Sequence, residues 1–284
     1  MSKITFRKHF DTIDALLNEA LLPTPWKGGE ESRHSRKDSD LEWYGNATFG
    51  NAVNMARTGW SDGLKSLQKN IESLAVNQSL AKSPAFYYDI AGAYPVPALA
   101  AAGIPENMVS FAPVSERARP IVRLVVALSV SCFFNARDFQ NYGAGLVSII
   151  DALESNDCRV ELTIATSGQR EKETSLFSVT VKEAQDSLDL DRIAFCLSHI
   201  AFYRRIFFGI YERILPEAWS DGYGRPRNIT KADIDSGVVI IPSAQTIGGD
   251  NLKTPESAFK ALLPAVSALL ADHDAAIPEI IFKN

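Results

Sequence analysis

The chain has little of several residue types that would narrow its function. It contains three cysteines in 284 residues, and none of them belongs to a C-x-x-C pair. Isolated cysteines in odd number indicate reduced thiols of a cytosolic protein rather than a disulfide framework or a zinc motif. No apolar run approaches the roughly 18 residues of a membrane-spanning helix, and the stretch from Met1 to Asp11 is too charged for a signal peptide. We therefore expect a cytoplasmic protein without a membrane partner.

Excess basic charge and catalytic motifs are also missing. The formal charge is −5 and the pI is about 5.5, so only a local patch could recruit nucleic acid. The chain has four histidines and no H-E-x-x-H motif, no G-x-S-x-G elbow, no P-loop and no G-x-G-x-x-G after a strand. Nothing in the sequence argues for an enzyme, and we predict no catalytic residue, no metal ligand and no cofactor.

What is present is organised around an apolar, β-branched stretch, Ile121–Leu128, which only Arg123 interrupts. Its length and composition are typical of a strand buried on both faces at the centre of a sheet. Strands and helices then alternate: we expect helices over 142–155 and 190–215 and from 255 onward, and strands over 159–165, 176–183, 238–241 and 278–282. The turn at 166–174 is too short for a crossover helix, so the strand after it must return antiparallel. This order predicts an α/β, doubly wound, mostly parallel sheet with one antiparallel edge strand.

The first 118 residues have a different pattern. Apolar spacing predicts a helix over 6–22, and a polar stretch at 23–40 with two prolines and paired glycines predicts a flexible loop. Short helices are expected from Thr48 and from Ser61, and prolines and glycines punctuate 83–120. We therefore expect two domains, a helical and irregular N-terminal region at 1–118 and an α/β domain at 119–284.

The reversed strand pair after the first helix resembles the layout of the von Willebrand factor A domain, over 119–284. That family's metal site uses Asp-x-Ser-x-Ser at the end of its first strand, and the matching positions here are Ala127, Ser129 and Ser131. Both hydroxyls are present and the carboxylate is missing. Pro242 and Ser243 stand where the family usually has a second aspartate. Since Mg²⁺ requires carboxylates among its ligands, the resemblance implies a degenerate domain without a working metal site.

The whole chain also resembles uncharacterised proteins carried by phages and plasmids. The segments that carry this resemblance are Trp43-Tyr44-Gly45, Asp89-Ile90-Ala91-Gly92, Gly103–Met108 and His199–Arg205. It implies a protein of a phage or mobile element, acting in the host cell cytoplasm, but no particular activity.

Open α/β sheets bind ligands at the carboxyl ends of their strands. The expected topology gathers seven polar side chains there: Ser129, Ser131, Asn135, Arg137, Ser243, Gln245 and Thr246. An anionic or peptide ligand suits this crevice better than a cation because it carries an arginine. The aromatics Trp43, Tyr44 and Trp60 are candidates for binding a partner, with packing between structural units as the other interpretation.

A second candidate surface combines arginine and tyrosine, which suit phosphate contact and base stacking. It comprises Arg117, Arg119, Arg204, Arg205, Tyr223, Arg225 and Arg227. Salt bridges on a helix surface are the other interpretation of Arg204 and Arg205.

Together these features favour a non-enzymatic interaction protein of a phage or other mobile element. It would act in a protein assembly through the crevice and the N-terminal aromatics. The alternative is an accessory factor that binds nucleic acid in phage replication or transcription. A Mg²⁺-dependent binding module is a third, weaker hypothesis.

Overall fold

The computed structural model describes residues 5–65, 67, 86–111, 120–155 and 158–270. They fall into two compact units. The main unit combines residues up to 75 with those from 120 onward, and the second unit, 76–119, is inserted between them. We call the described part of the second unit, residues 86–111, the insert. The predicted strand at 278–282, most of the predicted helix after Ser61, and Arg117 and Arg119 lie outside the described residues.

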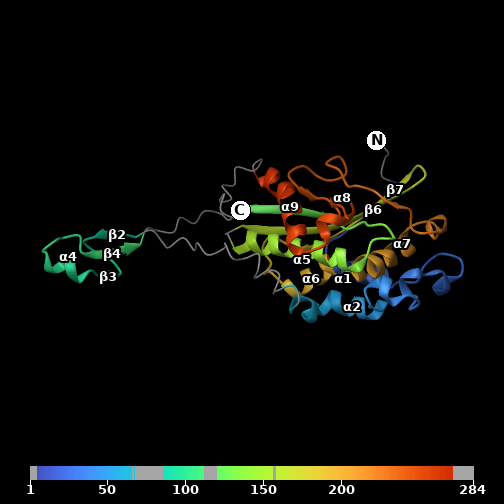
Figure 1. Cartoon of the computed structure of the whole chain (residues 1–284), viewed down its shortest axis with the longest axis horizontal. Coiled ribbons are helices and arrows are strands. Elements are labelled where there is room, and N and C mark those ends of the chain that lie inside the picture. Colours follow the sequence, from blue (N-terminus) through green and yellow to red (C-terminus); the bar gives the residue numbers. More distant parts are fainter. Residues whose placement is uncertain (1–4, 66, 68–85, 112–119, 156–157, 271–284) are drawn as a thin grey trace. The chain divides into compact units, whose positions relative to one another are not determined.

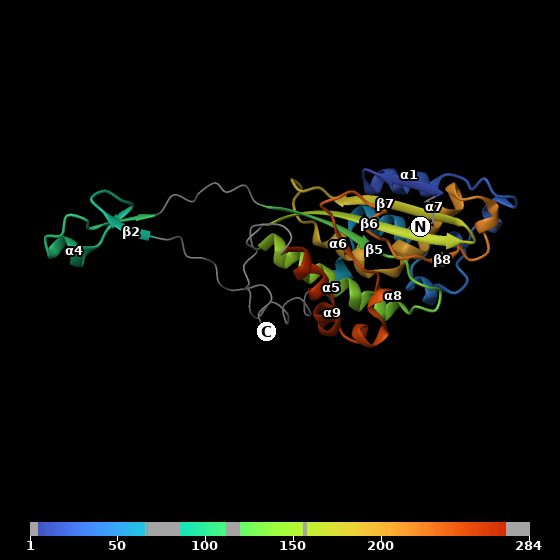
Figure 2. The same ribbon diagram turned by 90° about the horizontal axis from the view of Figure 1, so that it is seen from above.

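The main unit is built on a mixed, mostly parallel sheet in the order β1-β7-β6-β5-β9. Figure 2 shows β7, β6 and β5 side by side in this sheet. Strand β5 (Ile121–Ala127) pairs in parallel with β6 (Arg159–Arg170) and with β9 (Val239–Ile241). Strand β7 (Glu173–Lys182) runs antiparallel to β6, and β1 (Phe6–Phe10) pairs in parallel with β7. The short β8 (Arg225–Pro226) adds to the end of β6. The α/β class, the central strand and the antiparallel return after β6 are confirmed, but β7 is not the edge strand.

The helices cover one face of this sheet (Figure 1). On β5, Val122, Leu124 and Val126 face the large core that the helices share. Val125 and Ala127 point to the other face, where Ile229 and residues of the same loop cover them. The helices of the large core are α1 (Ile13–Leu21), α2 (Phe49–Thr58), α5 (Ala136–Ser155), α6 (Leu190–Ser198), α7 (Phe208–Ile214) and α9 (Pro255–Leu270). Among the described residues no helix packs on the second face, so the double winding predicted from the alternation of elements is wrong.

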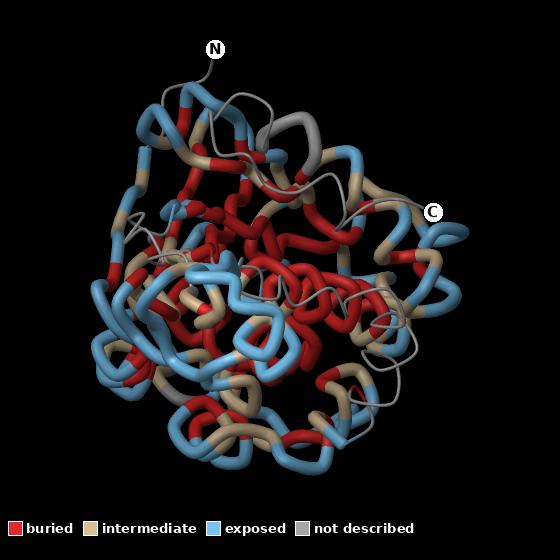
Figure 3. The backbone as a smooth tube through the Cα atoms, turned by 90° about the vertical axis from the view of Figure 1, so that its left-hand side faces the viewer, coloured by how far each residue is buried: buried red, intermediate tan, exposed pale blue. Residues whose placement is uncertain are grey.

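Figure 3 shows the resulting distribution of burial, with the buried backbone concentrated in the interior of the fold. Burying the faces of long strands under several helices supplies the apolar area that stabilises a unit of this size.

The N-terminal residues belong to the main unit rather than to an appendage. Residues 6–10 form a strand instead of the start of a helix, with Phe10 buried in the large core and His9 on the exposed face. Phe6 and Phe10 are four residues apart, a spacing that puts them on one face of a helix and equally on one face of a strand. The helix begins only after Thr12, whose hydroxyl accepts the Ala15 N–H at 3.1 Å. The chain therefore does not divide at residue 118.

The segment over 23–40, predicted to be a flexible loop, is held against α7. It contains a 3₁₀ turn at His34–Arg36, and the side chains of Arg33 and Ser35 are completely buried. Trp26 donates through Nε1 to the Leu215 carbonyl at 2.7 Å. The prediction failed because polar side chains that bond to one another inside the fold have the same composition as a solvated loop.

The predicted long helix at 190–215 is broken. It consists of α6, a π-helix at Phe202–Phe207 and α7. Within the described part of the chain, no single helix is long and apolar enough to cross a membrane. Taken together, α6 and the helical segment Phe202–Ile214 would be, but they meet at a bend of 71°.

The insert is a three-stranded antiparallel sheet in the order β2-β4-β3. Its strands are β2 (Phe86–Asp89), β3 (Tyr94–Pro95) and β4 (Met108–Phe111), with the one-turn helix α4 (Pro97–Ala101) between the last two. Short elements of this kind are expected where prolines and glycines punctuate the chain.

Candidate functional site

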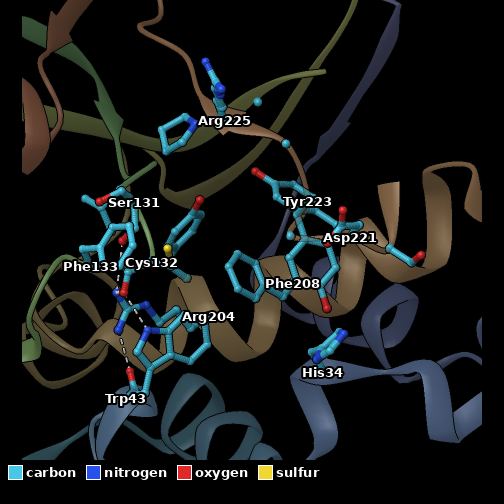
Figure 4. Close-up of a pocket in the computed structure, with 18 of the residues that line it drawn as sticks. His34, Trp43, Ser131, Cys132, Phe133, Arg204, Phe208, Asp221, Tyr223 and Arg225 are labelled. Atoms are coloured by element: carbon cyan, nitrogen blue, oxygen red, sulfur yellow. Dashed lines mark hydrogen bonds between the residues drawn. The ribbon is translucent and has the colours of Figure 1, made fainter. Parts of the chain in front are cut away.

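A cavity of about 450 Å³ lies at the carboxyl ends of β5 and β6, where an α/β sheet of this kind is expected to bind ligands (Figure 4). On one side it is lined by Ser131, Cys132 and Phe133, which follow β5, together with Trp43. The opposite side is formed by the segment 220–226 and by α7. Its volume lies within the range of small-molecule sites, roughly 300–1,000 Å³.

The π-helix supplies the floor of this cavity. Tyr203 and Phe208 are five residues apart and therefore lie on the same side of a π-helical turn, with their rings 5.0 Å apart. Both line the cavity, as do Arg204 and Tyr211. Short π-helical segments inside α-helices are rare and often occur at functional sites.

Arg204 is buried beside the cavity and binds backbone rather than solvent. Its Nη1 donates to the Trp43 carbonyl at 2.6 Å, and its Nη2 donates to the carbonyls of Phe134 at 2.6 Å, Ser131 at 3.2 Å and Cys132 at 3.3 Å. The guanidinium also lies 4.1 Å from the centre of the Trp43 ring. These contacts fix the cavity wall formed by residues 131–134.

The charge of Arg204 has no counter-ion in contact. It is 1 % exposed and forms no ion pair with any described carboxylate. Desolvation lowers the pKa of Arg204 to about 10, so the side chain still carries its charge at neutral pH. A buried cation that only neutral carbonyls surround favours an anion nearby.

Hydroxyl groups gather beneath the cavity. The Ser129 hydroxyl accepts the Ser167 N–H at 2.7 Å. The Tyr211 hydroxyl is close to those of Ser129, Tyr203 and Thr166, but it makes no well-oriented hydrogen bond with them. Burial raises the pKa of Tyr211 well above that of an exposed tyrosine, so the hydroxyl keeps its proton at neutral pH.

A buried ion pair lies behind the cavity wall to which Tyr223 belongs. The Glu212 carboxylate and Arg33 are both completely buried, with Nε and Oε2 3.3 Å apart. Glu212 also accepts the Ser35 N–H at 2.8 Å and the hydroxyl protons of Ser35 and Tyr223. Burial and the adjacent carboxylate raise the pKa of Tyr223, which keeps it a donor. This network holds both His34 and Tyr223 against the cavity.

Exposed groups surround the mouth of the cavity. Arg225 stands at the rim with its side chain directed outward, and it makes no ion pair or hydrogen bond through its guanidinium to a described residue (Figure 4). Asp221 is the carboxylate among the lining residues. Phe133 is 94 % exposed, and Cys132 is the exposed one of the three free cysteines.

The predicted crevice residues are divided among several places. Ser131 lines the cavity and its N–H donates to the Gln245 Oε1 at 2.7 Å, whereas Ser129 is buried below. Asn135 caps α5 through the Asp138 N–H at 2.7 Å, and with Arg137 it lines a second, open hollow that shares Trp43, Cys132, Phe133 and Arg204 with the cavity. Ser243 caps α8 (Ala244–Ile247), and Thr246 donates to the Asn228 Oδ1 at 2.9 Å beside a third hollow.

The proposed nucleic-acid residues do not form one basic surface. Arg204 and Arg205 are buried, and Arg205 donates to the carbonyls of Ser35 and Lys37 at 2.8 and 2.7 Å. Both interpretations of this pair as surface groups are wrong, because the π-helix directs them inward. Tyr223 is buried against Glu212, and Arg227 pairs with Asp233 at 2.8 Å. Arg225 is the exposed cation of the set among the described residues.

The N-terminal aromatics are separated. Trp43 and Tyr44 pack edge to face, 4.7 Å apart, and both line the cavity. Trp43 donates to the Cys132 carbonyl at 2.8 Å and Tyr44 donates to the His34 carbonyl at 2.6 Å. Trp60 packs instead against His199 at 4.7 Å. Two groups predicted separately, the strand-end serine and the aromatics, therefore meet at one cavity.

Four residues were not predicted as site residues: Tyr203, Phe208 and Tyr211, which line the cavity, and Glu212, which bonds to the lining residue Tyr223. A signal for part of this set exists in the segment from His199 to Arg213, where cations and a carboxylate interrupt a run that is otherwise too apolar for a solvent-facing helix. Such residues must be buried with partners.

The insert carries a second exposed set. Phe86, Tyr87, Tyr88, Ile90 and Tyr94 are 47–71 % exposed, whereas Val109 is the buried one among the described side chains of the insert. Three short strands with so little core are expected to gain stability from contact with another surface.

Metal ligands are not assembled in the described part of the chain, where no three His, Cys, Asp or Glu side chains come together. Ser129 and Ser131 correspond to the hydroxyl ligands of the A-domain. Ser129 is buried, with 3 % of its surface exposed, and Ser131 lines the cavity.

Comparison with known proteins gives a family but no activity. No curated protein matches the chain, and no solved structure matches it either. One family model, described as a domain of unknown function, DUF7192, matches residues 2–265. The chain, which this match covers almost completely, belongs to the DUF7192 family.

Proposed function

We propose that this chain is a non-enzymatic interaction protein that binds a protein partner through the insert. The observation that carries the proposal is the exposure of six large hydrophobic side chains, the five named above and Ile104, on an insert whose described side chains include one that is buried, Val109. Exposed apolar groups concentrated in so short a segment are typical of protein interaction sites.

The chemistry of the insert favours a protein over a nucleic acid. Residues 86–111 contain two carboxylates, Asp89 and Glu106, and neither lysine nor arginine. Aromatic platforms that stack bases work together with cations that neutralise phosphates. Tyrosines without such cations suit an apolar protein surface, at which tyrosine is enriched.

Site-specific photo-crosslinking in cells tests the proposal. A photoreactive phenylalanine analogue replaces Tyr88 in one variant and Tyr94 in a second, and the adducts are identified by mass spectrometry. The expected result is the same partner protein at both positions, since both belong to one small sheet.

The matched control places the analogue at Lys172, an exposed residue of the β6–β7 turn. Adducts that are equally abundant at the control position, or adducts to nucleic acid from the insert positions, would refute the proposal.

We further propose that the partner belongs to an assembly of a phage or mobile element in the cytoplasm. The segments that resemble phage and plasmid proteins support this, and two of them, Asp89–Gly92 and Gly103–Met108, lie in the insert. The nucleic-acid alternative retains Arg225 as its support among the described residues, together with Arg117 and Arg119 from the sequence. Anisotropy titration of labelled DNA at two salt concentrations tests it, because phosphate contacts weaken steeply with salt.

The Mg²⁺-dependent module has the least support. The position of the missing aspartate is Ala127, and the Ser129 hydroxyl already accepts a hydrogen bond from the backbone. A rise in melting temperature on addition of Mg²⁺ would revive this hypothesis.

A further inference from the structure

The cavity at the ends of β5 and β6 has no part in the interaction proposed for the insert, and its chemistry points to a ligand of its own. We propose that it binds a small aromatic anion, a flat ring system that carries one carboxylate or phosphate group.

Aromatic walls argue for the ring. Four aromatic side chains line the cavity as one continuous surface: Trp43 packs on Tyr44 with ring centres 4.7 Å apart and on Phe208 at 6.0 Å, and Phe208 packs on Tyr223 at 4.4 Å. Tyr223 is fixed by its hydrogen bond to Glu212, and Trp43 by its bond to Cys132 and by Arg204 stacked on it. Rigid aromatic side chains of this kind form a preorganised surface on which a planar group can pack.

The charges argue for the anion. Three arginines are buried in or behind the cavity wall, and two of them have carboxylates: Arg33 contacts Glu212, and Arg205 lies 3.7 Å from Asp38. Arg204, which lines the cavity itself, contacts no described carboxylate. An anionic group in the cavity would supply the missing counter-charge in a medium of low dielectric constant, where that attraction is strong.

Two further groups complete the recognition. The Tyr211 hydroxyl is a buried donor without a well-oriented partner, and it borders the cavity. Arg225 stands at the rim, directed away from the cavity and without a partner among the described residues (Figure 4). Under this proposal its flexible side chain turns toward the bound anion. The two lining arginines, Arg204 and Arg225, outweigh Asp221, the one carboxylate among the described lining residues.

Cys132 allows binding to be located. It is exposed at the cavity wall, whereas Cys158 and Cys196 are 1 % and 0 % exposed. Alkylation of the folded chain with iodoacetamide therefore reports on Cys132, and an occupied cavity slows it. A molecule that binds only to the exposed aromatics of the insert does not change this rate.

The experiment measures protection of Cys132 by three probes with the same ring system: naphthalene-2-carboxylate, 2-naphthyl phosphate and the neutral naphthalene-2-carboxamide. We expect the carboxylate, the phosphate or both to slow alkylation at concentrations about three- to tenfold lower than the amide requires, the size expected for one charge-assisted contact. Comparison of the two anions identifies the preferred anionic group.

The variant Arg225→Gln should reduce this difference between charged and neutral probes, because one of the two arginines that line the cavity is then missing. Arg123→Gln is the control, because Arg123 lies near the opposite end of β5 and is half exposed. Arg204 is unsuitable as the primary variant because four backbone carbonyls depend on it. No protection by any probe, equal protection by the anions and the amide, or an unchanged preference in Arg225→Gln would overturn the proposal.

Discussion

Removing one partner of the ion pair between Arg33 and Glu212 should strongly destabilise the main unit. Both side chains are completely buried, and the carboxylate accepts hydrogen bonds from Arg33, from Ser35 and from Tyr223. Replacing Arg33 with Met keeps the apolar stem but leaves a buried carboxylate without its counter-charge. Breaking one side of a buried pair lowers the free energy of unfolding by about 3–5 kcal/mol.

This loss would be a large part of the total stability, since a single domain unfolds with about 5–15 kcal/mol. Urea denaturation followed by tryptophan fluorescence measures it, because Trp26 is bonded within the same segment. The variant Arg33→Met/Glu212→Gln should recover part of the loss, since an amide oxygen can still accept the Ser35 N–H without an unpaired charge.

The control is Arg57→Met. Arg57 lies 3.8 Å from Asp14, with both side chains about half exposed or more, and such surface pairs contribute about 0–1 kcal/mol. If Arg33→Met loses no more than Arg57→Met, water reaches the buried pair and the reasoning is wrong.

Further predictions concern pH, packing and thiol access. Burial lowers the pKa of His199 to about 4, so as the pH falls the unfolded chain takes up a proton at this histidine before the folded chain does. The free energy of unfolding should therefore be highest above about pH 6.5 and fall by about 3 kcal/mol as the pH drops to about 4. Urea unfolding at several pH values should show a weaker dependence in His199→Asn, and an unchanged dependence would contradict this. A methyl group at Gly143 would lie 2.3 Å from the Ser198 Cα, so Gly143→Ala should lower the free energy of unfolding by about 1–3 kcal/mol or more. At Gly209 the nearest atom would be 3.3 Å away, so Gly209→Ala should change the free energy of unfolding by less than about 1 kcal/mol. Equal thermal stability of the two variants would refute the packing argument. One thiol per folded chain should react quickly with Ellman's reagent, and this reaction should be absent in Cys132→Ser. A second fast-reacting thiol would show that a buried cysteine is accessible.

The sequence was sufficient to predict the elements whose patterns are local. The β-branched run of β5 and the two-residue turn between β6 and β7 define the central strand and its antiparallel neighbour. The cap of α2 at Thr48, whose hydroxyl accepts the Asn51 N–H at 3.1 Å, was also predictable because it depends on residues three positions apart.

The rest depends on contacts between distant segments. Nothing near Phe6–Phe10 indicates that the strand completes a sheet edge formed by β7. Likewise, Arg204 and Arg205 have the sequence of surface groups, and only the π-helix turns them toward carbonyls supplied by residues far away in the chain. The cavity could be expected at the strand ends, but its aromatic walls come from segments whose placement the local pattern does not determine.

The pairing of β1 with β7 also has a consequence for the order in which the protein folds. Phe6 aligns with Ser175, so the first strand meets its neighbour across about 170 residues of chain. During synthesis, β1 and the apolar face of α1 leave the ribosome long before β7 has been synthesised. Strand β1 therefore cannot pair until β7 is available. Closing so long a loop is slow, so completion of the sheet edge is expected to be a late event in folding. A nascent chain arrested before residue 173 would therefore present β1 and the apolar face of α1 to chaperones, which would lose that target once β7 has emerged.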